Sequence, residues 1–166
     1  MRAILERRSI RKYTGEQVTD EQVQMLLKAA FAAPSAGNKQ PWHFVVLNDR
    51  EKINKISEVQ PSSKMLKEAT LAIIVCGEPA LEFYPGYFVQ DCAAATENIL
   101  IAATDMGLGS VWLGVYPRPE KVQAISSVFN LQEGIVPFSI ISIGYPGEIK
   151  EPSNRYDESK IHYNKW

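Results

Sequence analysis

Four short runs of apolar, β-branched residues constrain the fold of this chain more than any other feature. The run LAIIVCG at 71–77 contains no charged residue and is short enough to be a central strand buried on both faces. The other three runs are WHFVVLN at 42–48, SVWLGVY at 110–116 and VPFSIISIGYP at 136–146. Because helical segments separate these runs, the sequence predicts an α+β fold in which helices surround a small central sheet.

The helical segments carry their own start and stop signals. Thr19 and Gln22 have the spacing of a capping box, and apolar residues follow at helical intervals until Pro34. Asp49 is predicted to cap a short helix after the first strand. The longest segment, 87–107, is rich in alanine and apolar on most sides, so we expect it to be buried within the domain or at a subunit interface.

Length and composition favour a single domain, residues 1–166, with an ordinary hydrophobic core. The 18 lysines and arginines nearly balance the 19 acidic residues, so no global field favours nucleic acid or an anionic membrane as a partner. The longest strongly apolar run is far shorter than a membrane span. The two cysteines lack the neighbours that a metal site needs, so we expect buried core thiols, no metal and a cytoplasmic location.

A cationic segment, RRSIRKYTG at 7–15, contrasts with the net charge of −1 of the whole chain. Guanidinium groups suit a phosphate because their paired N–H groups meet its oxygens bidentately. By composition alone, the segment is also typical of a solvated cationic surface helix. It therefore indicates a local anion site only when it is combined with other features of the chain.

Three separated segments provide that combination. RRSIRKY at 7–13, APSAGNKQPWHFVVL at 33–47 and DMGLGSVWLGVY at 105–116 together resemble the FMN-dependent nitroreductase family. This resemblance implies a three-layer α/β/α sandwich with a central mixed sheet. It also implies a homodimer that exchanges a C-terminal arm, residues 148–166, and binds one FMN at each of two interface sites.

The resemblance assigns the cationic residues to the FMN of one subunit. Arg7 would bind the phosphate, and Arg8 and Ser9 would lie at the phosphate and the ribityl chain. Arg11 would lie near the pyrimidine edge of the flavin, and Lys64 would reach its N1/O2 edge. A cation at that edge favours the reduced, negatively charged flavin and raises its reduction potential.

The remaining positions complete the implied site. Leu113 and Gly114 would present a backbone N–H to flavin N5, and Arg155 would be a second phosphate-binding arginine. A loop of the other subunit would line the ring and the ribityl chain with Pro34, Ser35, Ala36, Gly37, Asn38 and Gln40. Taken singly, each of these residues is also typical of an ordinary loop, cap or surface charge.

The activity that the resemblance implies is a ping-pong oxidoreductase. NAD(P)H would give hydride to FMN N5, and a flat acceptor such as a quinone or nitroaromatic would then take its place. Phe83, Tyr84 and Tyr87 suit stacking on the acceptor, although an aromatic cluster at the start of a core helix has the same pattern. Two alternatives stay open: a flavin-binding or flavin-transferring protein without turnover, and a family branch acting on oxygen or on a halogenated or ring substrate.

Overall fold

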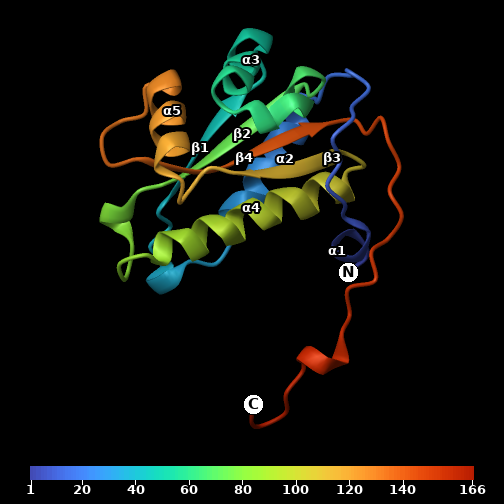
Figure 1. Ribbon diagram of the computed structural model, residues 1–166, viewed down its shortest axis with the longest axis vertical. Coiled ribbons are helices and arrows are strands. Elements are labelled where there is room, and N and C mark those ends of the chain that lie inside the picture. The colour runs from blue at the N-terminus through green and yellow to red at the C-terminus, as the bar shows by residue number, and fades with distance from the viewer.

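A four-stranded sheet forms the centre of the molecule in the computed structural model, which describes residues 1–166 (Figure 1). The strands are β1 (Trp42–Leu47), β2 (Leu71–Gly77), β3 (Gly109–Gly114) and β4 (Val136–Gly144). They lie in the order β1-β2-β4-β3, so β2 and β4 are central and β1 and β3 are edges. All seven residues of β2 are buried, as its uninterrupted apolar sequence predicts.

All three strand pairs of this sheet are antiparallel. The prediction of a mixed sheet is therefore corrected for the single chain, in which parallel pairing is limited to an isolated bridge between Ser9 and Ser110. The reason is topological: the four strands are used up in antiparallel pairs, so a parallel strand beside β3 would have to come from elsewhere. The outer edge of β3 is left without a full-length neighbour.

Helices cover both faces of the sheet, as predicted for a three-layer sandwich. They are α1 (Arg2–Glu6), α2 (Asp20–Phe31), α3 (Arg50–Val59), α4 (Tyr87–Asp105) and α5 (Pro119–Phe129). Alternate residues of β2 serve two cores: Ile73 packs with α2 and α4, whereas Ile74 packs with α3 and α5. In Figure 1, α3 and α5 lie above the sheet and α4 crosses below it.

Local signals in the sequence fix the ends of the helices. The predicted capping box is present: Thr19 Oγ1 accepts the Gln22 N–H at 3.2 Å, and Gln22 Oε1 accepts the Thr19 N–H at 3.0 Å. Asp49 Oδ1 likewise accepts the Lys52 N–H at 3.1 Å at the start of α3. After α4 the chain turns at Gly107, whose φ of 74° lies in the left-handed region that favours glycine.

Short 3₁₀ turns and an extended tail complete the chain. The turns are η1 (Ala36–Asn38), η2 (Pro61–Lys67), η3 (Pro79–Leu81) and η4 (Glu158–Lys160). Residues 151–166 are exposed throughout and run away from the body, as Figure 1 shows in red. Exchange of residues 148–166 between two chains as an arm stays a prediction. No helix of the protein has the length and apolar character needed to cross a membrane.

Candidate flavin site

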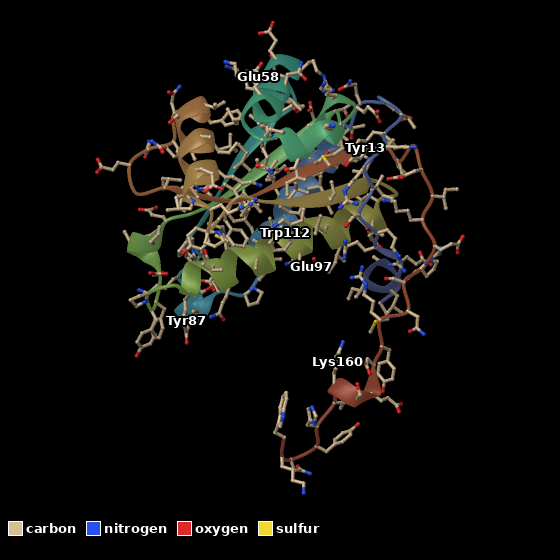
Figure 2. The ribbon with its side chains drawn as sticks, viewed as in Figure 1. Tyr13, Glu58, Tyr87, Glu97, Trp112 and Lys160 are labelled. Atoms are coloured by element: carbon tan, nitrogen blue, oxygen red, sulfur yellow. The ribbon has the colours of Figure 1, made fainter.

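The residues expected to form the site lie at two ends of the sheet. Where β2 and β3 begin, the cationic segment 7–11 runs beside β3. Where β2 and β3 end, the loop 34–40 leads into β1. Figure 2 labels Tyr13 near the first end and Tyr87 near the second, on opposite sides of the molecule. One chain therefore contains both halves of the expected site but does not bring them together.

Backbone contact with β3 sets the path of the cationic segment. The Ile10 N–H donates to the carbonyl of Ser110 at 3.0 Å. The Ile10 side chain lies directly on Gly109, where an added Cβ would come within 2.7 Å of Ile10 Cγ2. Glycine at position 109 therefore allows the segment to lie close against the edge strand, and this contact places the neighbouring arginines there.

The three arginines of this segment differ in what holds them. Arg8 Nε donates to the carbonyl of Glu151 at 2.9 Å, and Nη1 donates to a nearby backbone carbonyl at 3.0 Å. The remaining terminal nitrogen of Arg8, Nη2, is buried and has no partner. Arg7 Nε lies 3.3 Å from Glu97 Oε1 of α4, which Figure 2 labels, and Arg11 reaches only a backbone carbonyl at 3.4 Å. The segment therefore keeps unused cationic donors.

The segment Pro146–Glu151, called the strap below, ties the cationic segment to the start of the tail. Glu148 Oε1 accepts the backbone N–H of Arg11 at 2.7 Å. Lys150 Nζ lies 3.2 Å from the same carboxylate oxygen and donates to the Ser9 carbonyl at 2.7 Å. The hydrogen bond from Arg11 stabilises the carboxylate and so holds the pKa of Glu148 below its usual range, with Lys150 adding to the effect.

Lys64 lies at the same end of the sheet as the cationic segment. It is exposed on η2, and Arg50 of α3 fixes this turn by donating to three backbone carbonyls at and just after its end. Glu68, which follows η2, accepts the Tyr13 N–H at 3.1 Å. These contacts attach the turn that carries Lys64 to both α3 and the N-terminal segment, and the role of Lys64 at the flavin stays a prediction.

The loop 34–40 has an irregular backbone that its own polar groups support. The Gln40 backbone N–H donates to Ser35 Oγ at 2.9 Å, which closes the loop across its base. Residues with a left-handed backbone follow one another closely, with φ of 56°, 54° and 50° at Gly37, Asn38 and Gln40. Pro34 is the first residue of this loop, which begins shortly after α2 ends at Phe31.

Phe83, Tyr84 and Tyr87 form an exposed aromatic cluster beside this loop. The rings of Phe83 and Tyr84 meet edge to face with centroids 5.1 Å apart, and Tyr87 lies 5.7 Å from Tyr84. Phe83 also covers Gly37, where an added Cβ would come within 2.6 Å of Phe83 Cδ2. The cluster is thus part of the surface around the loop and does not belong to the hydrophobic core.

Leu113 and Gly114 lie near the end of β3. Leu113 is buried, whereas an added Cβ at Gly114 would meet nothing within 4 Å. The Val115 N–H donates to Phe138 of the next strand at 3.2 Å. Because N–H groups alternate in direction along an antiparallel strand, the Gly114 N–H points to the free edge of β3. Gly114 is exposed, so this donor lies at an accessible strand edge, and its role at flavin N5 stays a prediction.

Arg155 is the one expected site residue that lies far from the other expected site residues within the chain. It lies on the exposed tail, which runs away from the body in Figure 1. Its role as a second phosphate-binding arginine therefore depends on where the tail lies in an assembly of two chains, and it stays a prediction.

Comparison with known proteins identifies the family. The model of the Nitroreductase family matches residues 4–64 and 60–145. This chain belongs to the nitroreductase family. A protein of Archaeoglobus fulgidus, provisionally named NADH dehydrogenase/NAD(P)H nitroreductase, is 50% identical over 100% of this chain and 98% of its own length.

Solved structures of the nitroreductase family confirm the fold class. An FMN-dependent nitroreductase of Clostridium difficile has a TM-score of 0.92 and 32% identity, over 100% of both chains. A nitroreductase-like protein of Desulfovibrio desulfuricans, solved in complex with FMN, has a TM-score of 0.86 and 29% identity. That alignment covers 99% of this chain and 96% of the other.

The residues of this nitroreductase-family chain fit an FMN phosphate. The phosphate is a dianion that needs several N–H or O–H donors, and charged donors make the strongest such bonds. Arg8 Nη2 is a buried donor without a partner, and the Ser9 residue that follows carries a hydroxyl on the same segment. At the other end of β3, Gly114 is exposed. Donors suited to a phosphate are therefore present on the segment 7–11.

Three contacting residues were not expected from the sequence. Asp91 of α4 accepts the Ala36 N–H of the loop at 2.9 Å, Glu148 holds Arg11, and Arg50 holds the turn of Lys64. An acidic residue in a helix as apolar as α4 is a signal that could have pointed to Asp91. Glu148 and Arg50 lie in polar stretches of the sequence, where a further charged residue does not indicate a contact with the site.

Proposed function

We propose that this protein is an FMN-dependent oxidoreductase that takes hydride from NAD(P)H and passes electrons to a flat small-molecule acceptor such as a nitroaromatic or a quinone. The nicotinamide and the acceptor would use one flavin face in turn, which is a ping-pong cycle. Membership of the family and the FMN named for two structural neighbours support this proposal.

One observation carries the proposal from the geometry. The buried Arg8 Nη2 has no hydrogen-bond partner, although a buried charged donor is expensive to leave unsatisfied. A phosphate oxygen beside the segment 7–11 would satisfy it and would also engage Arg7 and Ser9. No side chain of the chain itself accepts a hydrogen bond from this nitrogen, so an anion that reached it would find a free donor.

A homodimer would complete the site. The cationic segment and the loop 34–40 lie at opposite ends of one sheet, so a single FMN between them requires the loop of a second chain. Two features of the monomer support such an assembly. The outer edge of β3 lacks a full-length neighbour, and the strap and the tail carry exposed apolar side chains: Ile149, Tyr156, Ile161, Tyr163 and Trp166.

Each group of residues has a distinct part in the proposed reaction. Bound FMN supplies two-electron redox chemistry that no side chain of this protein provides. Arg7 and Arg8 hold the phosphate and so fix the position of the ring. Lys64 and Arg11 place positive charge where negative charge develops on reduction, and the Gly114 N–H donates at the reacting edge. The aromatic cluster beside the loop limits access of water and stacks on a planar acceptor.

The experiment is anaerobic reduction of the protein reconstituted with FMN. We expect NADH or NADPH to bleach the visible flavin absorbance, and a nitroaromatic or quinone then to restore it. Steady-state lines at several acceptor concentrations should be parallel, as a ping-pong cycle requires. Retention of FMN without bleaching would indicate a flavin-holding protein instead. Failure to retain FMN at all would contradict the proposal.

A further inference from the structure

Backbone preference supports only part of the loop 34–40. Gly37 and Asn38 are residue types that adopt a left-handed backbone readily, whereas Gln40, with φ of 50°, is a type that rarely does. Its internal contacts, such as that between Gln40 Nε2 and Asn38 Oδ1 at 2.9 Å, close the loop on itself but do not attach it to the body. An attachment from outside must orient it.

One hydrogen bond to a buried side chain attaches the loop to the body, beside the packing of Phe83 on Gly37. The Ala36 N–H donates at 2.9 Å to Oδ1 of Asp91, which lies on α4, the long helix that crosses below the sheet (Figure 1). Asp91 is only 4% exposed, so water competes little for this bond. No other side-chain hydrogen bond joins the backbone of residues 34–40 to a helix or strand of the body.

The carboxylate is in an unfavourable environment for a residue with a purely structural role. Its second oxygen, Oδ2, is buried and has no partner. A buried carboxylate with one hydrogen bond costs stability, and an apolar side chain of the same size often replaces such a group without loss. Asp91 therefore lowers the stability of the folded protein, and what it provides in return is an acceptor oxygen for the Ala36 N–H.

We propose that Asp91 is a positioning residue that fixes the loop 34–40 in the shape that binds the flavin, acting through the Ala36 N–H. This proposal rests on the proposed function. Asp91 lies under a surface pocket of about 280 Å³ that Pro34, Ser35 and Ala36 line from the loop side. A loop released from Asp91 would move at the residues expected to contact the ring and the ribityl chain, and FMN would bind more weakly.

Two variants separate the acceptor oxygen from the charge and the volume of the side chain. Asp91→Leu keeps the branched shape, with somewhat more volume, but removes both oxygens, and Asp91→Asn keeps the volume and Oδ1 as an acceptor without the charge. A matched control is Thr96→Val on the same helix. Thr96 is also buried and hydrogen-bonded, to the Cys92 carbonyl and to Ser139, but it does not contact the loop.

Two readouts are measured on each purified protein: hydrogen exchange of the peptide 34–40 without cofactor, and the Kd for FMN. We expect Asp91→Leu to exchange this peptide faster than wild type and to bind FMN about tenfold more weakly or worse. Asp91→Asn should restore both to near wild-type values. Thr96→Val should lower the thermal midpoint without changing either. If Asp91→Leu does not fold, Asp91→Ala replaces it in the same comparison.

Each contrary result has a clear meaning. Unchanged exchange of the peptide in Asp91→Leu would overturn the proposal, and so would an Asp91→Asn protein as impaired as Asp91→Leu. An equal loss of FMN affinity in Thr96→Val would show that general destabilisation, and not the loop, is responsible. If wild type itself binds no FMN, the proposed function fails and so does the flavin part of this proposal, while the exchange data still decide whether Asp91 holds the loop.

Discussion

At the scale of single residues, the arginines of the cationic segment are held in different ways and should contribute differently. Arg7 is largely enclosed beside Glu97, whereas Arg11 is exposed and its guanidinium reaches only a backbone carbonyl. An enclosed guanidinium loses less conformational entropy when it binds a phosphate, and an exposed one can act through charge alone. Arg7 therefore suits the phosphate end, and Arg11 suits the redox edge.

This division predicts separate effects of two substitutions. Arg7→Ala should weaken FMN binding about tenfold or more, because a charge-assisted hydrogen bond to phosphate is lost. Arg11→Ala should leave the Kd nearly unchanged but lower the flavin reduction potential, because a cation near the reduced ring is lost. Fluorescence titration and equilibration with a reference dye measure the two quantities. Arg118→Ala, at an exposed arginine before α5, is the control. Identical effects at Arg7 and Arg11 would contradict the division.

The two cysteines give a second prediction at this scale. Burial raises the pKa of both Cys76 and Cys92 to about 12, so the reactive thiolate is nearly absent at neutral or mildly alkaline pH. We expect neither thiol to react with an aromatic disulfide reagent in the native protein, and both to react after unfolding in denaturant. Rapid reaction of either thiol in the folded state would show that the core is more open than the structure indicates.

At the scale of elements, the attachment of the strap to the cationic segment depends on pH, because it uses the carboxylate of Glu148. Hydrogen bonding from Arg11 lowers the pKa of Glu148, so the folded state favours the carboxylate. For a carboxyl whose folded pKa is lowered, the stabilisation is complete above the ordinary pKa of about 4.3 and is lost as the pH falls through the lowered value. The strap should therefore remain attached at neutral pH and loosen only in acid.

The Arg11 amide resonance in NMR spectra reports this attachment. We expect it to titrate with a midpoint below about 4.3, and to lose this titration in Glu148→Gln. The control is Glu151→Gln, because Glu151 contacts Arg8 through its backbone carbonyl and not through its carboxylate. A midpoint at or above the ordinary value for glutamate would show that the carboxylate of Glu148 is not held by Arg11 in solution.

The sequence predicts those elements whose signals are local. The capping box of Thr19, the apolar run of β2 and the glycine stop after α4 each depend on residues within a few positions, and all are present. The contact between Arg11 and Glu148 joins residues 137 positions apart in the chain, so no local pattern predicts it. The prediction of a mixed sheet was wrong for one chain because strand direction depends on which segments become neighbours.

The candidate site shows the same limit. The cationic segment and the loop 34–40 were predicted from their composition and their resemblance to the family. Their placement at opposite ends of one sheet, and the hold of Asp91 on Ala36, follow only from the fold. Residue types indicate which chemistry is available, whereas packing decides which groups share a site.

At the scale of the whole molecule, three features of the single chain point to the same assembly. The outer edge of β3 lacks a full-length neighbour, the tail is exposed and the two halves of the site are separated, and the proposed homodimer would account for all three features. A shared site has a property that a site within one chain lacks: damage to different halves on different chains leaves one intact site. This property allows a direct test by subunit complementation.

The test uses one variant in each half of the site. Arg7→Glu reverses a charge in the cationic segment. Gly37→Val places a branched side chain at a φ of 56° and against Phe83, which distorts the loop. Each variant alone should bind FMN poorly. A mixed dimer, purified through two different affinity tags, pairs an intact cationic segment from one chain with an intact loop from the other. We predict that it binds one FMN with wild-type affinity and that NAD(P)H reduces this FMN, whereas a mixed dimer that binds no better than its parents would contradict the shared flavin site.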